Sequence, residues 1–292
     1  MILITGASGF VGRNLIRHIE PASNVRCLVR DSSSTNGLEG CELVKGDITD
    51  IDSLVKATKG VSAVIHLVAA LGAASYEENY RIHVTGAKNL IEACKTNGVN
   101  RIVVASSVAT LADRKSDYGV TKAMADELFL KSGLDVTILK PDFIYGPDGK
   151  GFLTLVNVIK NSRFVPIIGN GHYRRQPVHV DDVAAAIFKS LDNKAIGKTY
   201  VVASKEPIEF DTMVDMIMKS MGIKKIKVHI PVRLALTLAK LMKIKKNPTL
   251  TKTVVLGIAQ DRCANVSPMI NELGVKPRDF ETGLKEVMKN LV

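Results

Sequence analysis

The chain has 292 residues, of which 46% are hydrophobic, and this is enough for one large α/β domain or for such a domain with a smaller lobe. Its formal charge of +11 comes mostly from one late segment, since no acidic residue stands between Met216 and Gln260. That segment has neither the aromatic side chains that stack on bases nor a known binding module, so we expect no nucleic-acid partner.

Membrane spans and metal sites are not expected either. No run approaches the roughly 18 apolar residues of a spanning helix, and Met1 leads directly into a strand-like segment without a signal region, so we expect a cytoplasmic protein. Cys27, Cys41, Cys94 and Cys263 lack metal-ligand or redox-motif spacing. They are interpreted as reduced thiols, with a Cys27 to Cys41 pairing as the alternative.

Short runs rich in β-branched residues alternate with helical patterns through the first half of the chain. The predicted strands are Met1 to Thr5, Val25 to Arg30, Glu42 to Lys45, Ala63 to Leu67, Arg101 to Ala105 and Val136 to Lys140. The predicted helices are Val11 to Ile19, Asp52 to Thr58, Asn79 to Thr96 and Lys122 to Lys131. This alternation predicts an α/β fold with a doubly wound, Rossmann-type parallel sheet covered on both faces.

The pattern changes after about Tyr145, where turns rich in Gly and Pro separate isolated strands and helices. We predict strands at 178–180 and 199–202, and helices at 182–191, 211–221, 231–246 and 282–291. The expected division is a dinucleotide-binding domain over 1–145, with 178–202 packing back onto it, and a smaller substrate-binding lobe over 146–292.

A glycine-rich loop joins the first strand to the first helix. Gly6 permits a tight turn, Gly9 lets the backbone approach a pyrophosphate, and Gly12 lets the helix pack closely on the strand. The unpaired N–H groups of the helix N-terminus favour the same anion. The predicted cofactor-binding residues here are Gly6, Ser8, Gly9, Phe10, Val11, Gly12 and Arg13.

The end of the second strand is where such folds read the adenosine ribose. Arg30 stands there and can pair with a 2′-phosphate, which favours NADP(H); NAD(H) is the alternative because Asp31 follows directly. Asp47 and Ile48 follow the third strand, and the Asp47 carboxylate could accept from the adenine amino group. Taken alone, Asp47 would serve as a turn cap.

The candidate reactive residues lie around the fifth strand. Tyr118 and Lys122 are four apart on one helix face, and an ammonium beside a phenol favours the phenolate, which would make Tyr118 a usable acid or base. That spacing is common by itself. It gains weight because Ser106 and Ser107 end the strand at the carboxyl edge of the sheet, where ligands bind.

Together these pieces resemble the extended short-chain dehydrogenase/reductases, the epimerase and dehydratase branch, over nearly the whole chain. Further matching pieces are Gly46-Asp47, His66 to Ala70, Lys140-Pro141, Tyr145-Gly146-Pro147 and His179 to Val183. The resemblance implies that Tyr118 is the acid/base, that Lys122 activates it and binds the ribose, and that Ser107 orients the substrate. It implies that Leu67, Val68 and Ala69, and Pro141, Phe143 and Ile144, line the nicotinamide side, and that Arg175 grips a substrate phosphate or carboxylate.

Within this superfamily the chain is most similar to the group related to the nucleotide-binding accessory subunit of respiratory complex I. Arg81 to Gly86, Arg174 to Val178 and the basic tail carry that likeness, and His83 stands where sugar-nucleotide epimerases usually have asparagine. Members of that group often bind cofactor without known turnover. A NADP(H)-binding accessory or redox-sensing subunit is therefore the alternative to an oxidoreductase, epimerase or dehydratase.

The remaining expectations concern partners. The segment 231–246 predicts a basic amphipathic helix that could lie on an anionic membrane or an acidic partner; burial of its apolar side in the lobe is the other interpretation. A small-molecule substrate is expected in a pocket, and a monomer and a homodimer are equally favoured. The pocket residues are expected to be Tyr76, Tyr145, Phe152, His172, Tyr173 and Arg175.

Overall fold

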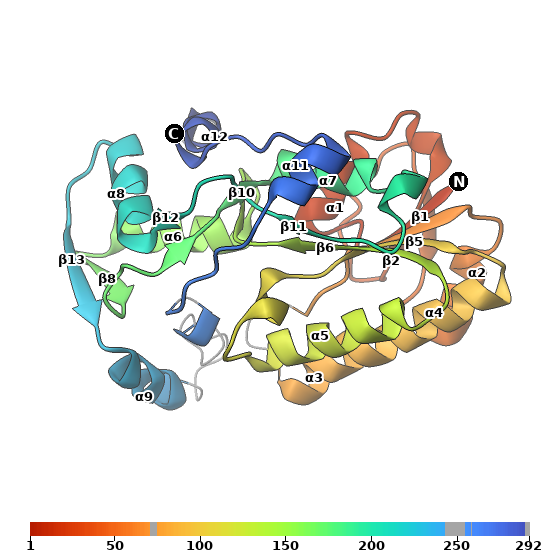
Figure 1. Ribbon diagram of the computed structural model, residues 1–292, viewed down its shortest axis with the longest axis horizontal. Helices are drawn as coiled ribbons and strands as arrows, with labels where there is room; N and C mark the ends of the chain where they lie inside the picture. The colour runs from red at the N-terminus through yellow and green to blue at the C-terminus, as the bar shows by residue number, and fades with distance from the viewer. Residues whose placement is uncertain (71–74, 243–254, 258, 290–292) are drawn as a thin grey trace.

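The computed structural model describes residues 1–70, 75–242, 255–257 and 259–289, and a seven-stranded parallel sheet forms its centre (Figure 1). The strand order is β3-β2-β1-β4-β5-β6-β11. The bounds are β1 Ile2–Thr5, β2 Val25–Val29, β3 Glu42–Lys45, β4 Ala63–His66, β5 Arg101–Ala105, β6 Asp135–Pro141 and β11 Thr199–Val202. The order reverses between β1 and β4, and this switch point is where open α/β sheets bind ligands.

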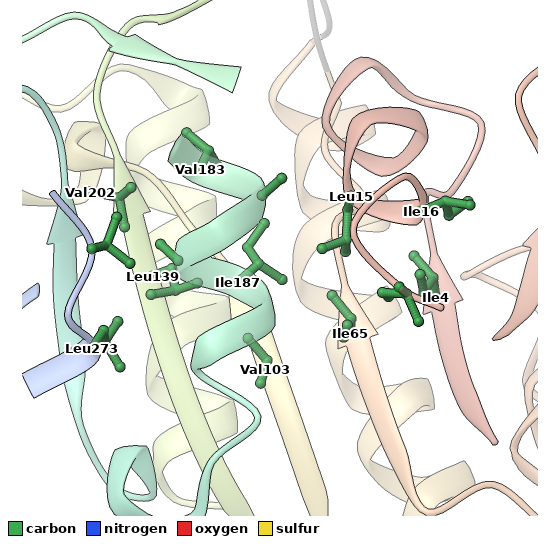
Figure 2. Packing of buried hydrophobic residues seen from close by; sticks show 14 of the residues in the cluster. Ile4, Leu15, Ile16, Ile65, Val103, Leu139, Val183, Ile187, Val202 and Leu273 are labelled. Carbon is green, nitrogen blue, oxygen red and sulfur yellow. The ribbon is translucent and has the colours of Figure 1, made fainter. Parts of the chain in front are cut away.

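Helices cover both faces of the sheet, as its continuous apolar strands require. On one face lie α2 (Ile51–Thr58), α4 (Gly86–Thr96) and α5 (Asp117–Leu130); on the other lie α1 (Phe10–Ile16), α7 (Val180–Lys189) and α11 (Ser267–Leu273) (Figure 1). Figure 2 shows side chains of α1 and α7, among them Leu15 and Ile187, pointing toward sheet residues such as Ile65. Two separate apolar cores therefore sandwich the sheet.

The second part of the chain builds a smaller unit beside the sheet. Its helices are α6 (Lys150–Asn161), α8 (Phe210–Ser220), α9 (Val232–Met242) and α12 (Phe280–Lys289). Its strands pair two by two: β7 (Ile144–Tyr145) with β10 (Val178–His179), β9 (Arg174–Arg175) with β12 (Ile208–Glu209), and β8 (Phe164–Ile168) with β13 (Ile226–Ile230). A third apolar core joins α6, α8 and α12.

The six strands predicted for the first half all occur, each within two residues of its predicted bounds. Segment 178–202 packs onto the central sheet, because its helix α7 packs against α1 and its strand β11 pairs with β6. The predicted strand at 178–180 is wrong at Val180, where α7 begins instead. The sequence interpretation also missed α6, α11 and the β8/β13 pair; the division at residue 145 stays a prediction.

The long helical pattern at 79–96 is three consecutive pieces. They are α3 (Tyr76–Tyr80), one turn of π-helix, η2 (Arg81–Thr85), and α4. A short 3-10 turn, η3 (Val108–Leu111), follows β5, and two more, η1 (Ala22–Asn24) and η4 (Asn193–Ala195), lie in loops. Turns of π-helix occur often at functional sites, and this one carries His83.

Candidate functional site

The glycine loop has the close backbone contacts that a dinucleotide site needs. Gly6 has a φ of +81°, and a Cβ there would lie 2.9 Å from the carbonyl carbon of Leu67. A Cβ on Gly12 would lie 2.4 Å from the carbonyl oxygen of Ala7. Gly9 begins α1 without a side-chain cap, so backbone N–H groups are left to face a ligand. The loop therefore fits the pyrophosphate of a nicotinamide dinucleotide.

Three charged residues lie where the adenosine end of the cofactor is expected. Arg30 is exposed after β2, whereas Asp31 is bound in an ion pair of 2.9 Å with Lys45 of β3. Arg13 donates to the carbonyl oxygen of Ser8 at 3.1 Å and so closes over the glycine loop. An exposed guanidinium therefore stands at the end of β2, beside an exposed ion pair.

Asp47 and Ile48 lie at this edge but make contacts within the protein. The Asp47 carboxylate accepts from the N–H and the hydroxyl of Thr49, at 2.8 and 2.7 Å. Burial raises the pKa of Asp47, but these bonds and the charges of Arg30 and Arg81 outweigh it, so the pKa is lowered. Ile48 is buried against Gly86. Asp47 thus acts as the turn cap that its sequence context also allowed.

The predicted nicotinamide-side residues follow strands β4 and β6 at the carboxyl edge of the sheet. Leu67, Val68 and Ala69 are partly exposed directly after β4. Pro141 ends β6 and is buried, while Phe143 and Ile144 are partly buried. Phe10 packs toward Gly146 and Gly149 in the turn that follows β7. The structure therefore brings both predicted segments to the sheet edge that carries the glycine loop.

Ser107 and Tyr118 meet at the end of β5. Ser107 begins η3, where its hydroxyl accepts from the N–H of Ala109 at 3.1 Å, and its side chain hydrogen-bonds Tyr118. Helix α5 approaches this turn closely, since a Cβ on Gly119 would lie 2.6 Å from the oxygen of Ala109. The small residue after Tyr118 is what allows the phenol to reach the serine.

Lys122 lies one turn further along α5 and is buried. Its ammonium donates to the carbonyl oxygens of Val68 and Ala105, at 3.1 and 3.0 Å, and so joins the ends of β4 and β5. Burial lowers the pKa of Lys122 to about 8, against the opposing charge of Asp126. An ammonium has three donors, so one remains for a ligand hydroxyl.

Ser106, the less favoured serine in the sequence, belongs to a structural network. Its hydroxyl donates to Asp126 at 2.8 Å, and Lys140 forms an ion pair of 3.1 Å with the same carboxylate oxygen. Lys140 also donates to the hydroxyl of Thr110 at 2.8 Å. Lys140 therefore ties β6 to α5 and η3.

The predicted activation of Tyr118 by Lys122 stays a prediction, and the groups that act on the pKa of Tyr118 in the structure are others. Burial raises the pKa of Tyr118 to about 12, with the charge of Asp126 adding to the rise, while the Ser107 hydrogen bond and the charge of Arg262 oppose it. At neutral pH the Tyr118 phenol therefore keeps its proton.

His83 connects the same elements from the opposite side. Its Nε2 accepts from the N–H of Ala70 at 3.0 Å, and its Nδ1 hydrogen-bonds the Thr121 hydroxyl at 2.9 Å. Its ring lies edge-on to that of Tyr118, with centroids 5.3 Å apart. Burial, and then the charge of Lys122, lowers the pKa of His83 to about 3, so the imidazole is neutral. It supports Tyr118 by packing.

Two predicted substrate residues are held within the protein. Tyr145 is 0% exposed and packs on Phe152, His179 and Phe280, so its expected place in the pocket wall is wrong. Arg175 is buried and forms an ion pair with Asp142, and it donates to the carbonyl oxygen of Gly257 at 3.1 Å. Its guanidinium is already satisfied by these partners.

The other expected pocket residues are dispersed. Phe152 is 0% exposed, Tyr76 is exposed at the start of α3, and His172 pairs with Glu209 at 3.0 Å on the surface. Tyr173 stacks on Phe210 and lines a pocket beside α9 together with His229 and Val232. That pocket contains none of the three catalytic candidates.

One residue near Tyr118 was missed by the sequence interpretation. Arg262 comes from a late segment whose backbone N–H donates to the carbonyl oxygen of Arg174 at 3.0 Å, and its charge acts on Tyr118. No local motif marks this position, because Arg262 is 144 residues further along the chain and reaches the site only through tertiary packing.

Comparison with known proteins agrees with this geometry. The profile of the NAD dependent epimerase/dehydratase family matches residues 2–203, and the chain belongs to that family. A 2-alkyl-3-oxoalkanoate reductase of Stenotrophomonas maltophilia (strain K279a) is 24% identical, with 98% of both chains covered. The Homo sapiens sterol-4-alpha-carboxylate 3-dehydrogenase, decarboxylating, is 26% identical over 78% of this chain and 68% of its own.

A solved structure extends the likeness to the whole fold. MoeE5 in complex with UDP-glucose and NAD has a TM-score of 0.77 and 25% identity, with 99% of this chain and 97% of that chain covered. The homologues are named as oxidoreductases, dehydrogenases and epimerases, and the protein is an NAD(P)-dependent enzyme of this family. Within the described ranges, no helix is long and apolar enough to cross a membrane.

Proposed function

We propose that the protein is an NADP(H)-preferring oxidoreductase that interconverts a carbonyl and an alcohol, with Tyr118 as the proton donor and acceptor. The observation that carries this proposal is the meeting of Ser107, Tyr118 and Lys122 at the carboxyl edge of the sheet, beside the glycine loop. The nicotinamide of the bound cofactor would supply or accept the hydride. The side chains of the protein would transfer the proton to or from the substrate oxygen.

In the reducing direction, Tyr118 donates its proton to the substrate oxygen, and the Ser107 hydroxyl holds that oxygen in place. A phenol with a pKa of about 12 keeps its proton at neutral pH, so reduction starts from the abundant form. The remaining donor of Lys122 is available for the ribose hydroxyls of the cofactor. His83 and Lys140 fix the surroundings of this group and need no proton exchange of their own.

The preference for NADP(H) rests on the end of β2. Arg30 is exposed directly after β2, where its guanidinium can pair with a 2′-phosphate, while Asp31 forms a surface ion pair with Lys45. NAD(H) remains the alternative cofactor. Calorimetric titration of NADPH and NADH distinguishes them, with Arg30→Ala as the test variant and Arg17→Ala, an exposed arginine directly after α1, as the charge-matched control.

The expected result is tighter binding of NADPH than of NADH by wild-type protein, and a difference that disappears in Arg30→Ala but not in Arg17→Ala. A charge-assisted pair contributes about 1.5–3 kcal/mol, or roughly 10- to 100-fold in affinity. Equal binding of both cofactors by the wild type would refute the NADP preference. Binding of neither, with Gly9→Glu as the blocked-site control, would refute the oxidoreductase proposal.

The second candidate, a cofactor-binding accessory subunit of the complex I type, draws on the basic segment 231–246. Leu234, Leu238 and Leu241 are exposed on α9, while Ala235 and Ala239 face the protein. The lysines at 243–246 lie outside the described residues. We infer peripheral contact of α9 with an anionic membrane surface, which either function could use; the names of the relatives favour turnover.

Co-sedimentation with vesicles of phosphatidylglycerol, compared with phosphatidylcholine alone, tests this contact. Binding to the anionic vesicles should fall when Leu238→Asp places a charge on the exposed face of α9. A Leu111→Asp variant, at an exposed leucine of η3, is the control. No binding by the wild type, or equal loss in both variants, would refute the membrane contact.

A further inference from the structure

Arg262 is held in a fixed place beside the catalytic group. The residue before it, Asp261, accepts from the backbone N–H of Arg174 at 2.7 Å and from its guanidinium at 2.9 Å. Two residues after it, the N–H of Ala264 donates to the side chain of Gln176 at 2.7 Å. The backbone of Arg262 is therefore anchored on both sides to β9 and the residues that follow it.

The guanidinium of Arg262 has no anion of its own. Its Nε is buried without a hydrogen-bond partner, and no carboxylate of the described residues lies within ion-pair distance of it. The neighbouring carboxylate, Asp142, is fully used: it accepts from Nε and Nη2 of Arg175 and from the N–H of Gln176. Arg175 thus takes the one neighbouring carboxylate, which leaves the positive charge of Arg262 uncompensated.

The positive charge of Arg262 affects Tyr118. The charge of Arg262 lowers the pKa of Tyr118, and burial, followed by the charge of Arg175, lowers the pKa of Arg262 itself to about 10. Arg262 is partly buried, and a partly desolvated charge without a counterion is stabilised when a ligand supplies the opposite charge. Gln260, two residues before Arg262, donates to the carbonyl oxygen of Arg114 at 3.4 Å, which places this segment against the turn that precedes Tyr118. An anion bound to Arg262 would therefore lie on the side of the site where Tyr118 stands.

We propose that Arg262 binds the carboxylate of the substrate, and that the substrates are 3-oxo or 3-hydroxy acids, an inference that rests on the function proposed above. The two terminal nitrogens of the guanidinium match a carboxylate with two parallel hydrogen bonds, and the single negative charge of the carboxylate balances the single positive charge of Arg262. Arg175 supports Arg262 by occupying Asp142, which would otherwise pair with Arg262.

The names of two relatives fit this substrate class. A 2-alkyl-3-oxoalkanoate and a sterol-4-alpha-carboxylate oxidised at position 3 both carry a carboxylate near the reacting carbon. In the reduction, the carbonyl carbon gains the hydride and the carbonyl oxygen gains the Tyr118 proton. The carboxylate keeps its bonds throughout and serves only to position the substrate.

The test is NADPH-dependent reduction of 3-oxodecanoate and of its neutral methyl ester by wild-type protein and by Arg262→Gln. Arg163→Gln, at a distant arginine over Phe164, controls for loss of one positive charge. The kcat/KM for the acid should fall by about 100-fold in Arg262→Gln and remain unchanged in Arg163→Gln, as expected for loss of a charge-assisted pair. The kcat/KM for the ester should stay within about threefold of the wild-type value, because the ester lacks the charge that Arg262 binds. Arg262→Lys should recover part of the acid activity, since it restores the charge without the fork.

An equal fall for acid and ester, or no effect on either, would overturn the role of Arg262. Lack of turnover with every carbonyl compound tested would overturn the proposed function. In that case a binding measurement still tests whether Arg262 binds a carboxylate. Calorimetry on the NADP-loaded protein should show binding of 3-hydroxydecanoate, weaker or absent binding of decane-1,3-diol, and loss of the difference in Arg262→Gln. Equal binding of acid and diol by the wild type would overturn the inference.

Discussion

Replacement of His83 by glutamine should make the protein less sensitive to acid. In the folded protein the neutral ring accepts from Ala70 with Nε2 and bonds Thr121 through Nδ1, so protonation of the ring would break the bond to Ala70. The pKa of His83 is lowered from 6.5 to about 3. Because the unfolded chain binds the proton more readily, stability is complete above pH 6.5 and is lost as the pH falls toward 3.

The loss of stability in acid follows from the lowered pKa of His83. A difference of about 3.5 pKa units corresponds to an upper limit of about 5 kcal/mol, of which about 2 kcal/mol is already lost at about pH 5. Urea unfolding at about pH 7.5 and about pH 5 measures this loss, and comparison of the variants cancels the titration of groups common to both. The wild type should lose about 2 kcal/mol more than His83→Gln over this interval. Equal losses would refute the interpretation of His83 as a buried neutral ring.

Two further predictions concern stability. Gly12→Ala should lower the free energy of unfolding in urea by about 1–3 kcal/mol through overpacking, because its Cβ would lie 2.4 Å from a backbone oxygen; Gly151→Ala, where the nearest atom is at 3.8 Å, should change it little. Equal effects would contradict the close approach. Asp142→Asn should cost about 3 kcal/mol because it leaves Arg175 buried and unpaired, whereas Glu127→Gln removes an exposed pair and should cost less than about 1 kcal/mol. A loss of similar size in both variants would refute the buried pair.

The sheet could be predicted because its strands are buried on both faces and read as short apolar runs between amphipathic helices. The glycine loop could be predicted because its three glycines follow a strand and open a helix. Helix α6 was missed because Gly151 and the Gly-Pro turn before it resemble a loop, although apolar residues recur along 152–159 with helical spacing. Strand β8 contains Pro166, which normally argues against a strand, and here it pairs with only one neighbour.

The site could be predicted only where a local pattern carries it. Ser107, Tyr118 and Lys122 lie within 16 residues and around one strand end, so the sequence already brings them together. Tyr145 was assigned to the pocket, yet α12 covers it: a Cβ on Gly283 would lie 2.0 Å from its hydroxyl oxygen. Arg262 depends on a contact across the fold, which no spacing in the sequence expresses.

The proposed function depends most directly on the hydroxyl group of Tyr118. The decisive measurement is therefore the turnover of Tyr118→Phe, which lacks only that hydroxyl. NADPH consumption with 3-oxodecanoate should fall by about 100-fold or more in Tyr118→Phe, the usual contribution of a positioned general acid, while calorimetry shows unchanged NADPH binding. Tyr80→Phe, on α3, is the matched control and should keep wild-type turnover. Turnover by Tyr118→Phe at the wild-type rate would contradict the assignment of the proton donor.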